Sequence, residues 1–235
     1  MQAFFDALPV AYRKLASLPD RFRPSNSRLI EQYFSSGVTK KLHLGCGFHV
    51  LPNWLNTDLV PSREVAYLDL TKRFPFESAT FDYVFSEHAI EHIPYEKGLG
   101  MLQESFRVLR PGGKIRIVTP DFAFLKSLYE PEKNELQKSY LAWAKERWLG
   151  GRSCANLEIH VINNFFRNWG HQFIYDASSL TAALLAAGFS NVSRCRVNES
   201  ENTELRGLEN ETRMPVGFLQ LESIVLEAQK VGPQA

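Results

Sequence analysis

Glycines and carboxylates follow three successive apolar runs in the first part of this 235-residue chain. Gly45 and Gly47 follow the first run, Asp58 ends the second, and Asp69 lies near the end of the third. Glycine lets the backbone approach a ligand closely, one carboxylate could accept hydrogen bonds from the vicinal hydroxyls of a ribose, and the next could hold the exocyclic amine of adenine. Ligands of open α/β sheets bind at the carboxyl ends of the strands. Either Asp alone is more typical of a turn or cap, but the ordered set predicts an adenosine-binding site.

The spacing of these residues argues against the commoner nucleotide sites. A dinucleotide fingerprint has a third glycine, where this chain has Val50, and an acidic residue about 20 positions further on. Asp58 instead comes eleven residues after Gly47. The chain also lacks the Gly-Lys-Ser/Thr of a phosphate-binding loop. Only eight residues separate Gly45 from Trp54, which predicts a first crossover helix of one turn at most, or a short second strand.

Histidine is the side chain best suited to accept a proton near neutral pH, and the chain has six: His43, His49, His88, His92, His160 and His171. His43 lies within an apolar run, where we expect a structural role. His88 and His92 are four residues apart, beside Glu87 and Glu91, and would share one helical face if this segment is helical. This spacing also occurs in metal sites, but a catalytic zinc needs three protein ligands and no third is evident. We therefore expect no metal.

The elements that position these residues alternate between short apolar runs and helical stretches. One predicted helix covers residues 96–110, and another follows the candidate cap Asp176. This rhythm predicts an α/β fold with a Rossmann-like, mostly parallel seven-stranded sheet, helices on both faces and a final antiparallel pair. The seven candidate strands are Lys41–Gly45, Trp54–Asp58, Val65–Leu70, Phe81–Ser86, Lys114–Pro120, Val192–Val197 and Leu219–Ala228.

Three segments depart from this rhythm. Residues 1–39 are expected to form an N-terminal helical extension to a domain spanning residues 40–230. Residues 121–170 form a helical insertion after the fifth strand, with helices over Phe122–Tyr129 and Glu132–Trp148 followed by an aromatic loop. The insertion is either a lid that forms an acceptor pocket from aromatic and arginine side chains, or a helical unit with its own aromatic core. The polar stretch before the last strand is expected to be a long exposed connection.

Composition and charge exclude several classes of protein. The net charge of +1 gives no attraction to nucleic acid, so we expect no nucleic-acid partner. Three cysteines without a Cys-x-x-Cys pair indicate neither a disulfide framework nor zinc, which favours a cytoplasmic location. No apolar run approaches the ~20 residues of a membrane helix, so no integral membrane segment is expected. The N-terminal amphipathic stretch would pack on its own domain or contact a membrane surface or partner.

Four segments together resemble the class I S-adenosylmethionine-dependent methyltransferases, and within them the methyltransferase type 11-like group. The chain looks like members of that group associated with cell-surface polysaccharide synthesis. The resemblance covers roughly residues 40–230 and implies a methyltransferase with S-adenosylmethionine as its cofactor. The segments are HLGCG (His43–Gly47), NWLNTDL (Asn53–Leu59), LDLTKRFPFESATFDYVFSEHAIEHI (Leu68–Ile93) and ESFRVLRPGGKIRIVTPD (Glu104–Asp121).

The resemblance also implies roles for matched positions. The Gly45-Cys46-Gly47 turn would line the methionine and ribose end of the cofactor, and Asp58 would hold the ribose hydroxyls. Asp69 and the backbone of Leu70 would read the adenine. Ser86 and Glu87 would face the methionine part. The very short first crossover and the missing third glycine depart from the commoner family pattern.

These roles predict transfer of a methyl group to a hydroxyl of a sugar or another small acceptor. The reaction needs an acceptor aligned with the S–CH3 bond and a base for the hydroxyl proton. His171 is our first candidate for this base and His160 the second, because in related enzymes this region faces the substrate; either could equally be structural. The alternatives are a nicotinamide-dependent oxidoreductase, which the spacing disfavours, and a binding protein without turnover.

Overall fold

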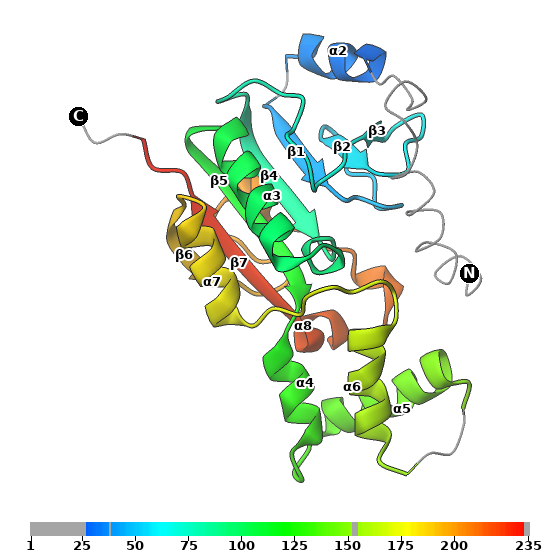
Figure 1. Cartoon of the computed structure of the whole chain (residues 1–235). Helices are drawn as coiled ribbons and strands as arrows, with labels where there is room; N and C mark the ends of the chain where they lie inside the picture. Colours follow the sequence, from blue (N-terminus) through cyan, green and yellow to red (C-terminus); the bar gives the residue numbers. More distant parts are fainter. Residues whose placement is uncertain (1–26, 38, 152–154, 233–235) are drawn as a thin grey trace.

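The computed structural model describes residues 27–37, 39–151 and 155–232. Its core is a seven-stranded sheet with the strand order β3-β2-β1-β4-β5-β7-β6. The first five strands run parallel, and β7 is antiparallel to both of its neighbours. This topology confirms the predicted α/β fold class with its mostly parallel seven-stranded sheet (Figure 1). The expectation of helices on both faces differs from the described structure, in which a connection covers most of one face. The strands are β1 (Lys41–Leu44), β2 (Leu55–Asp58), β3 (Ala66–Tyr67), β4 (Phe81–Glu87), β5 (Leu109–Pro120), β6 (Ser190–Arg194) and β7 (Ser223–Gln229).

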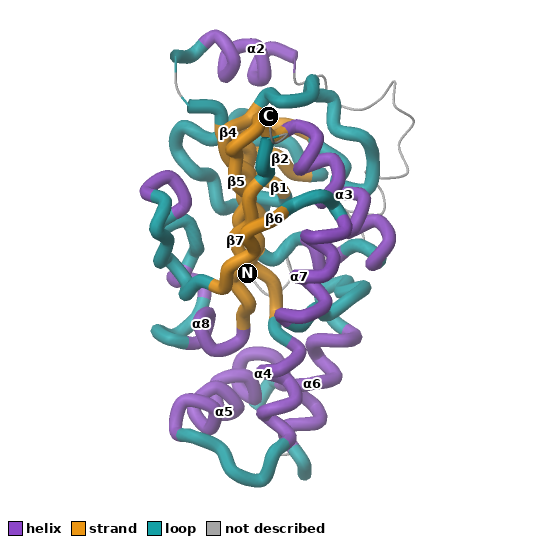
Figure 2. Tube along the Cα trace, turned by 90° about the vertical axis from the view of Figure 1, so that its left-hand side faces the viewer, coloured by secondary structure: helices purple, strands orange, loops and turns teal. Residues whose placement is uncertain are grey.

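One face of the sheet is covered by helices. Figure 2 shows α3 (Tyr95–Val108) and α7 (Ala177–Ala186) on the same side of the strands. They pack on the largest apolar cluster, which includes Leu42, Ile115 and Leu226 from the strands. Central strands buried on both faces consist mainly of aliphatic residues, because neither face meets water. The helix α2 (Ser27–Ser35) adds partly buried side chains to the same cluster.

The opposite face is covered by the connection between β6 and β7, residues 195–217. Its Leu205 and Leu208 are buried with Trp54 and Phe85 in a second apolar cluster. Only two 3-10 turns, Thr203–Leu205 and Glu211–Arg213, give it regular structure. The expectation of an exposed connection was wrong, because apolar residues spaced within this polar stretch cover a sheet face that has no long helix over it.

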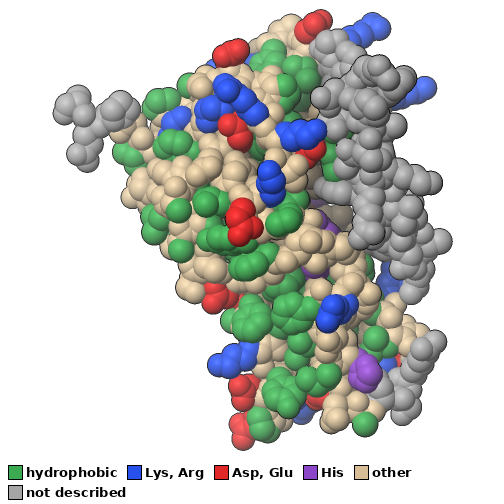
Figure 3. All heavy atoms as spheres, in the orientation of Figure 1, with side chains coloured by type: hydrophobic (Ala, Val, Ile, Leu, Met, Phe, Trp, Pro, Cys, Tyr) green, Lys and Arg blue, Asp and Glu red, His purple; other side chains and the backbone are tan. Residues whose placement is uncertain are grey.

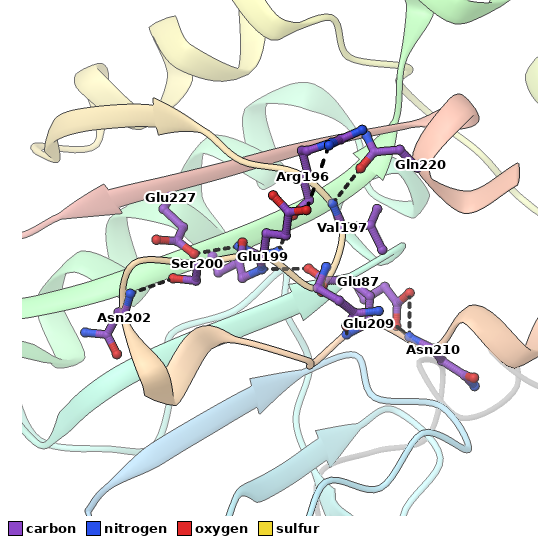
Figure 4. Close-up of polar contacts among 12 residues, drawn as sticks. Glu87, Arg196, Val197, Glu199, Ser200, Asn202, Glu209, Asn210, Gln220 and Glu227 are labelled. Atoms are coloured by element: carbon purple, nitrogen blue, oxygen red, sulfur yellow. Dashed lines mark hydrogen bonds and ion pairs between the residues drawn. The ribbon is translucent and has the colours of Figure 1, made fainter. Parts of the chain in front are cut away.

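A buried ion cluster fastens this connection to the sheet. Arg116 on β5 is fully buried and contacts Glu209 at 2.6 Å and Glu227 at 2.5 Å. Its Nη1 and Nη2 also donate to two backbone carbonyls of the connection, those of Glu199 and Arg196. Figure 4 labels these four partners: Glu209, Glu227, Glu199 and Arg196. The attraction between these buried charges offsets their desolvation because each guanidinium nitrogen has a hydrogen-bond partner. The connection is therefore held in one position over the sheet.

The described backbone of the crossover between β1 and β2 contains turns and no helix, and the side chain of Asn56 holds it in place. Its amide NH2 donates to the carbonyls of Leu51 and Trp54, at 2.9 and 3.1 Å. Its carbonyl oxygen accepts from the N–H of Leu51 at 2.9 Å and from His43 Nδ1 at 3.0 Å. Four buried hydrogen bonds from one side chain hold the short crossover against the sheet. The predicted short crossover is confirmed.

The insertion after β5 contains α4 (Phe122–Tyr129), α5 (Glu135–Leu149) and α6 (Leu157–Arg167). The aromatic loop predicted after α5 was wrong, because α6 is an amphipathic helix whose Val161 and Phe165 are buried. The aromatic rings of the insertion pack mainly on one another, in a third cluster that also contains Phe218. Most of these rings therefore form the insertion's own core. This cluster includes ring pairs Tyr140–Trp148 and Trp148–Trp169.

Several boundaries also differ from expectation. The third strand has only two residues, Ala66 and Tyr67, and the Leu68 N–H makes its last bond to β2, at the Asp58 carbonyl. The last strand is preceded by the short helix α8 (Phe218–Glu222), which falls within the predicted strand Leu219–Ala228. Asp176 caps α7 as predicted, accepting from the Ser179 N–H. The N-terminal amphipathic stretch lies outside the described residues. Among the helices of the described part, none is long and apolar enough to span a membrane.

Candidate active site

The turn after β1 brings the backbone to the carboxyl edge of the sheet. Gly45 and Gly47 have φ values of +63° and +53°, a conformation that favours glycine. A Cβ on Gly45 would lie 2.5 Å from the Cβ of Ala89, so the turn packs against the segment after β4. A Cβ on Gly47 would meet nothing within 4 Å. The turn thus presents open backbone at Gly47, suited to close approach by a ligand.

Cys46, between the two glycines, is buried, and its N–H donates to the Thr57 carbonyl at 3.0 Å. Burial raises the pKa of its thiol to about 12, with a further contribution from the Asp58 charge. The thiol therefore stays protonated and has no nucleophilic role. Its backbone bond ties the glycine turn to β2.

Asp58 ends β2 beside this turn. Its Oδ2 accepts from the Gly47 N–H at 3.0 Å and its Oδ1 from the Val60 N–H at 2.9 Å. Burial raises the pKa of this carboxyl, while those backbone N–H groups and the charge of His92 oppose the rise. Each carboxylate oxygen has further lone pairs. The group can therefore accept two hydroxyls of a diol without losing its backbone bonds.

Asp69 lies at the same edge, because β2 and β3 pair in parallel and Asp58 is opposite Tyr67. Its Oδ1 accepts from both the N–H and the hydroxyl of Thr71, at 3.0 and 2.6 Å. Its Oδ2 lies 3.7 Å from Lys72 Nζ and can accept a further N–H. The neighbouring Leu70 is buried. The structure thus places both carboxylates on adjacent strand ends.

The end of β4 supplies Ser86 and Glu87, which differ in their partners. Ser86 Oγ is fully buried and has no hydrogen-bond partner among the described residues. The Glu87 carboxylate contacts the Asn210 N–H at 3.2 Å (Figure 4). It also lies 3.3 Å from Arg213 and 3.3 Å from His49 Nδ1. Burial opposes ionisation, but the His49 bond and the Arg213 charge lower the pKa of Glu87. Glu87 therefore joins the β6–β7 connection to the glycine turn.

Glu91 lies at the centre of a second part of the site, and no role for it was predicted from the sequence. It is fully buried in the 3-10 turn Ile90–His92, 3.4 Å from His88 Nδ1 and 3.9 Å from His92 Nε2. Thr119 donates to its other oxygen at 3.1 Å. Burial opposes ionisation, but His88, His92 and His171 together lower the pKa of Glu91 to about 2. A buried carboxylate thus stands among three imidazoles.

His171 reaches this cluster from the segment before α7. Its ring lies 4.8 Å from the His92 ring, and its Nδ1 is 2.7 Å from the Phe165 carbonyl. A carbonyl only accepts, so Nδ1 carries the proton and Nε2 holds the free lone pair. Burial lowers the pKa of His171 to about 4, against the raising effect of Glu91. The ring is therefore neutral at pH 7.

His160 has different surroundings from His171. It is exposed on α6, whereas His171 is partly buried in the cluster. Figure 3 shows a histidine side chain at the surface in the lower part of this face and small parts of others set back near its middle. His88 and His92 do not share a regular α-helical face, because His88 has a left-handed backbone with φ of +48°. The repeated Glu-His pairs in SEHAIEHI were a local signal for the cluster.

Comparisons with known proteins find a matching domain model and similar folds. A family model described as "Methyltransferase domain" matches residues 56–117, from β2 into β5. A crystal structure of a SAM-dependent methyltransferase from Archaeoglobus fulgidus is similar, with 16% identity and a TM-score of 0.51 over 87% of this chain and 91% of that one. One from Mesorhizobium loti has 15% identity and a TM-score of 0.48 over 87% and 98%. No curated protein matches the sequence.

The fold and the matched domain define a transferase of the class I methyltransferase type. The chain is an enzyme of this class, and its cofactor is S-adenosylmethionine. The residues at the sheet edge fit this group: two carboxylates at adjacent strand ends, open backbone at Gly47, and an orphaned hydroxyl on Ser86. The predicted class, fold and cofactor are confirmed.

Proposed function

We propose that this methyltransferase methylates a hydroxyl oxygen of a sugar or another small acceptor. The observation that carries the proposal is the neutral His171 beside the buried Glu91, with its Nδ1–H bonded to Phe165 and its Nε2 free to accept a proton. His92 joins the two parts of the site, because its ring contacts His171 and its charge acts on Asp58. A hydroxyl acceptor needs such a base, since an alcohol is a weak nucleophile until it loses its proton.

The cofactor residues of the proposal follow the strand edge. The Gly45-Cys46-Gly47 turn would line the methionine and ribose end, and Asp58 would accept both ribose hydroxyls. The Asp69 carboxylate and the Leu70 backbone would bind the adenine. Ser86 would offer its unpartnered hydroxyl to the methionine part. Glu87 would act there through the turn, because its carboxylate is already engaged with His49 and Asn210.

S-adenosylmethionine supplies an activated methyl group on a sulfonium. The chain's own residues then have two tasks, to align the acceptor oxygen with the S–CH3 bond and to take its proton. Alignment can lower the barrier by ~7–11 kcal/mol, and a positioned base adds roughly 10²–10⁴-fold in rate. The O–C bond forms as the S–C bond breaks, and the hydroxyl proton passes to Nε2 of His171. Exposed His160 is the weaker candidate for this task.

The surface proposed to bind the acceptor lies on the insertion. Phe122 and Phe166 are 44% and 42% exposed, and their rings lie 6.3 Å apart, edge to face. Phe122 follows β5 directly, at the same sheet edge as Ser86 and Glu87. Aromatic faces stack on the apolar faces of sugar rings. We therefore assign residues 121–170 as the acceptor-binding insertion of a domain spanning residues 40–230, with residues 1–39 as its extension.

We also propose that the protein is cytoplasmic and takes part in polysaccharide synthesis. The thiols of Cys46 and Cys195 are free, as is usual in a reducing compartment. The face in Figure 3 mixes basic and acidic side chains, which favours a small acceptor or glycan over nucleic acid.

The proposal is tested by methyl transfer from labelled S-adenosylmethionine to a panel of sugars, glycans and small phenols, with amines as a second arm. We expect an O-methylated product, and a loss of turnover in His171→Ala with unchanged cofactor affinity. His160→Ala is the matched control and should keep its turnover. Methylation of amines alone, or normal turnover in His171→Ala, would refute the proposed acceptor or base.

A further inference from the structure

We infer that Glu91, His92 and His171 form a binding site for a divalent transition metal. Their ligand atoms all lie within 4.8 Å of one another. For three atoms within 4.8 Å of one another, some point lies within about 2.8 Å of all three, against the ~2.0–2.2 Å of zinc bonds to nitrogen and oxygen. Small rotations of three side chains would close that difference. The inference deepens the proposed function and rests on it for the role of the metal.

The side chains are already oriented as metal ligands are. A metal-bound histidine usually donates its other ring N–H to a carbonyl or carboxylate, and bound carboxylates are themselves hydrogen-bonded. His171 donates Nδ1–H to the Phe165 carbonyl at 2.7 Å, which leaves Nε2 for a cation. Thr119 donates to Glu91 Oε2 at 3.1 Å, which leaves Oε1. Both supporting bonds are present in the structure.

A second observation also supports a metal site, because one carboxylate oxygen of Glu91 lacks a hydrogen bond among the described residues. Oε1 is buried and has no hydrogen-bond partner among the described residues, although His88 Nδ1 lies 3.4 Å away. A buried charged oxygen without a hydrogen bond is costly. A cation between Oε1 and the two imidazoles would remove that cost. His92 and His171 are both partly exposed, and the His92 side chain is 29% exposed, so an ion can enter from the histidine side of the cluster.

Two imidazoles and one carboxylate suit Zn²⁺, Fe²⁺ or Co²⁺ better than Mg²⁺ or Ca²⁺. Three protein ligands leave a coordination position open. An acceptor hydroxyl bound there would lose its proton to solvent more readily, because a bound cation stabilises the alkoxide. The S–C bond would break as the alkoxide forms the new O–C bond. Nε2 of His171 cannot bind a metal and accept a proton at once, so the loaded enzyme would use the metal in place of the base.

The test uses tag-free full-length protein, stripped with a chelator and titrated with Co²⁺ and Zn²⁺ chlorides by calorimetry. We expect one equivalent of metal per chain and visible absorption bands from bound Co²⁺. Thr119→Val should weaken binding by roughly 10–100-fold, and His92→Ala by more. His160→Ala removes an exposed histidine outside the cluster and should bind metal as the parent does. Glu91→Gln is informative if it folds; the partly exposed His92 gives a variant that does not depend on this.

The outcomes separate this inference from the proposed function. Absence of stoichiometric binding, or equal binding by the parent and His92→Ala, would overturn the metal site. Full methyl transfer by chelator-stripped protein would also overturn its role and leave His171 as the base. Metal binding without methylation of any hydroxyl acceptor would instead refute the proposed function while the site remained.

Discussion

The backbone N–H of Gly47 donates a 3.0 Å hydrogen bond to Asp58 Oδ2, which joins the glycine turn to the carboxylate at the next strand end. This contact makes the turn and the carboxylate one unit, so a change in either should affect both. Asp58 also accepts from Val60 and is therefore held at both oxygens. A carboxylate held in this way needs little reordering when a diol binds, which favours affinity.

Asp58→Asn should bind S-adenosylmethionine more weakly with little change in fold. Hydrogen bonds to a charged group contribute about 1.5–3 kcal/mol, so loss of the charge should weaken binding by roughly 10–100-fold. Calorimetric titration with the cofactor or its demethylated product measures this. The exposed Glu64 provides the control variant, Glu64→Gln, which should bind normally. Unchanged affinity in Asp58→Asn would remove its ribose role.

Alanine at Gly45 and at Gly47 should have different effects, although both glycines have positive φ. At Gly45 the new Cβ would lie 2.5 Å from the Cβ of Ala89. The free energy of unfolding should therefore fall by more than the ~1–2 kcal/mol cost of the left-handed backbone alone. At Gly47 the Cβ enters open space, so we expect mainly a loss of cofactor affinity. Urea unfolding and cofactor titration of both variants measure these two effects. Equal stability losses would contradict the packing at Ala89.

Asn56→Ala should lower the free energy of unfolding by about 3 kcal/mol or more, because it removes four buried hydrogen bonds and leaves backbone groups without partners. Cofactor binding should fall as well, since the crossover carries the turn after Gly47. Chemical denaturation measures the stability change. The control Asn163→Ala removes one exposed side-chain bond to Ile159 and should cost far less. A small loss in Asn56→Ala would mean that packing alone holds the crossover.

Protonation of His43 should destabilise the fold in mild acid. Burial lowers the pKa of His43 from 6.5 to about 4. The unfolded chain therefore binds more protons than the folded chain between these values, and stability falls as pH drops through this window. The loss from His43 between about pH 7 and about pH 5 is roughly 2 kcal/mol. Urea unfolding at both pH values should show a smaller difference in His43→Gln, and identical differences would contradict the prediction.

The local patterns predicted the sheet well where an apolar run is bounded by turn residues. The runs Lys41–Gly45 and Lys114–Pro120 identified β1 and most of β5 from hydrophobicity, although β5 begins earlier, at Leu109. The third strand was overestimated because Leu68 and Leu70 are buried by packing beyond the ladder and not by strand pairing. The helix α6 was missed because its stripe of buried residues lies among aromatic residues that are equally typical of a loop.

The sequence by itself determined the class of fold, the cofactor and the order of residues along the strand edge, since strand ends and turn chemistry depend on neighbours in the chain. Tertiary structure alone brought His171 to Glu91 and Glu209 to Arg116, pairs separated by long stretches of sequence. These contacts depend on how the insertion after β5 and the β6–β7 connection pack against the rest of the domain. That packing is determined by many apolar contacts between residues far apart in the sequence, which local sequence patterns do not contain.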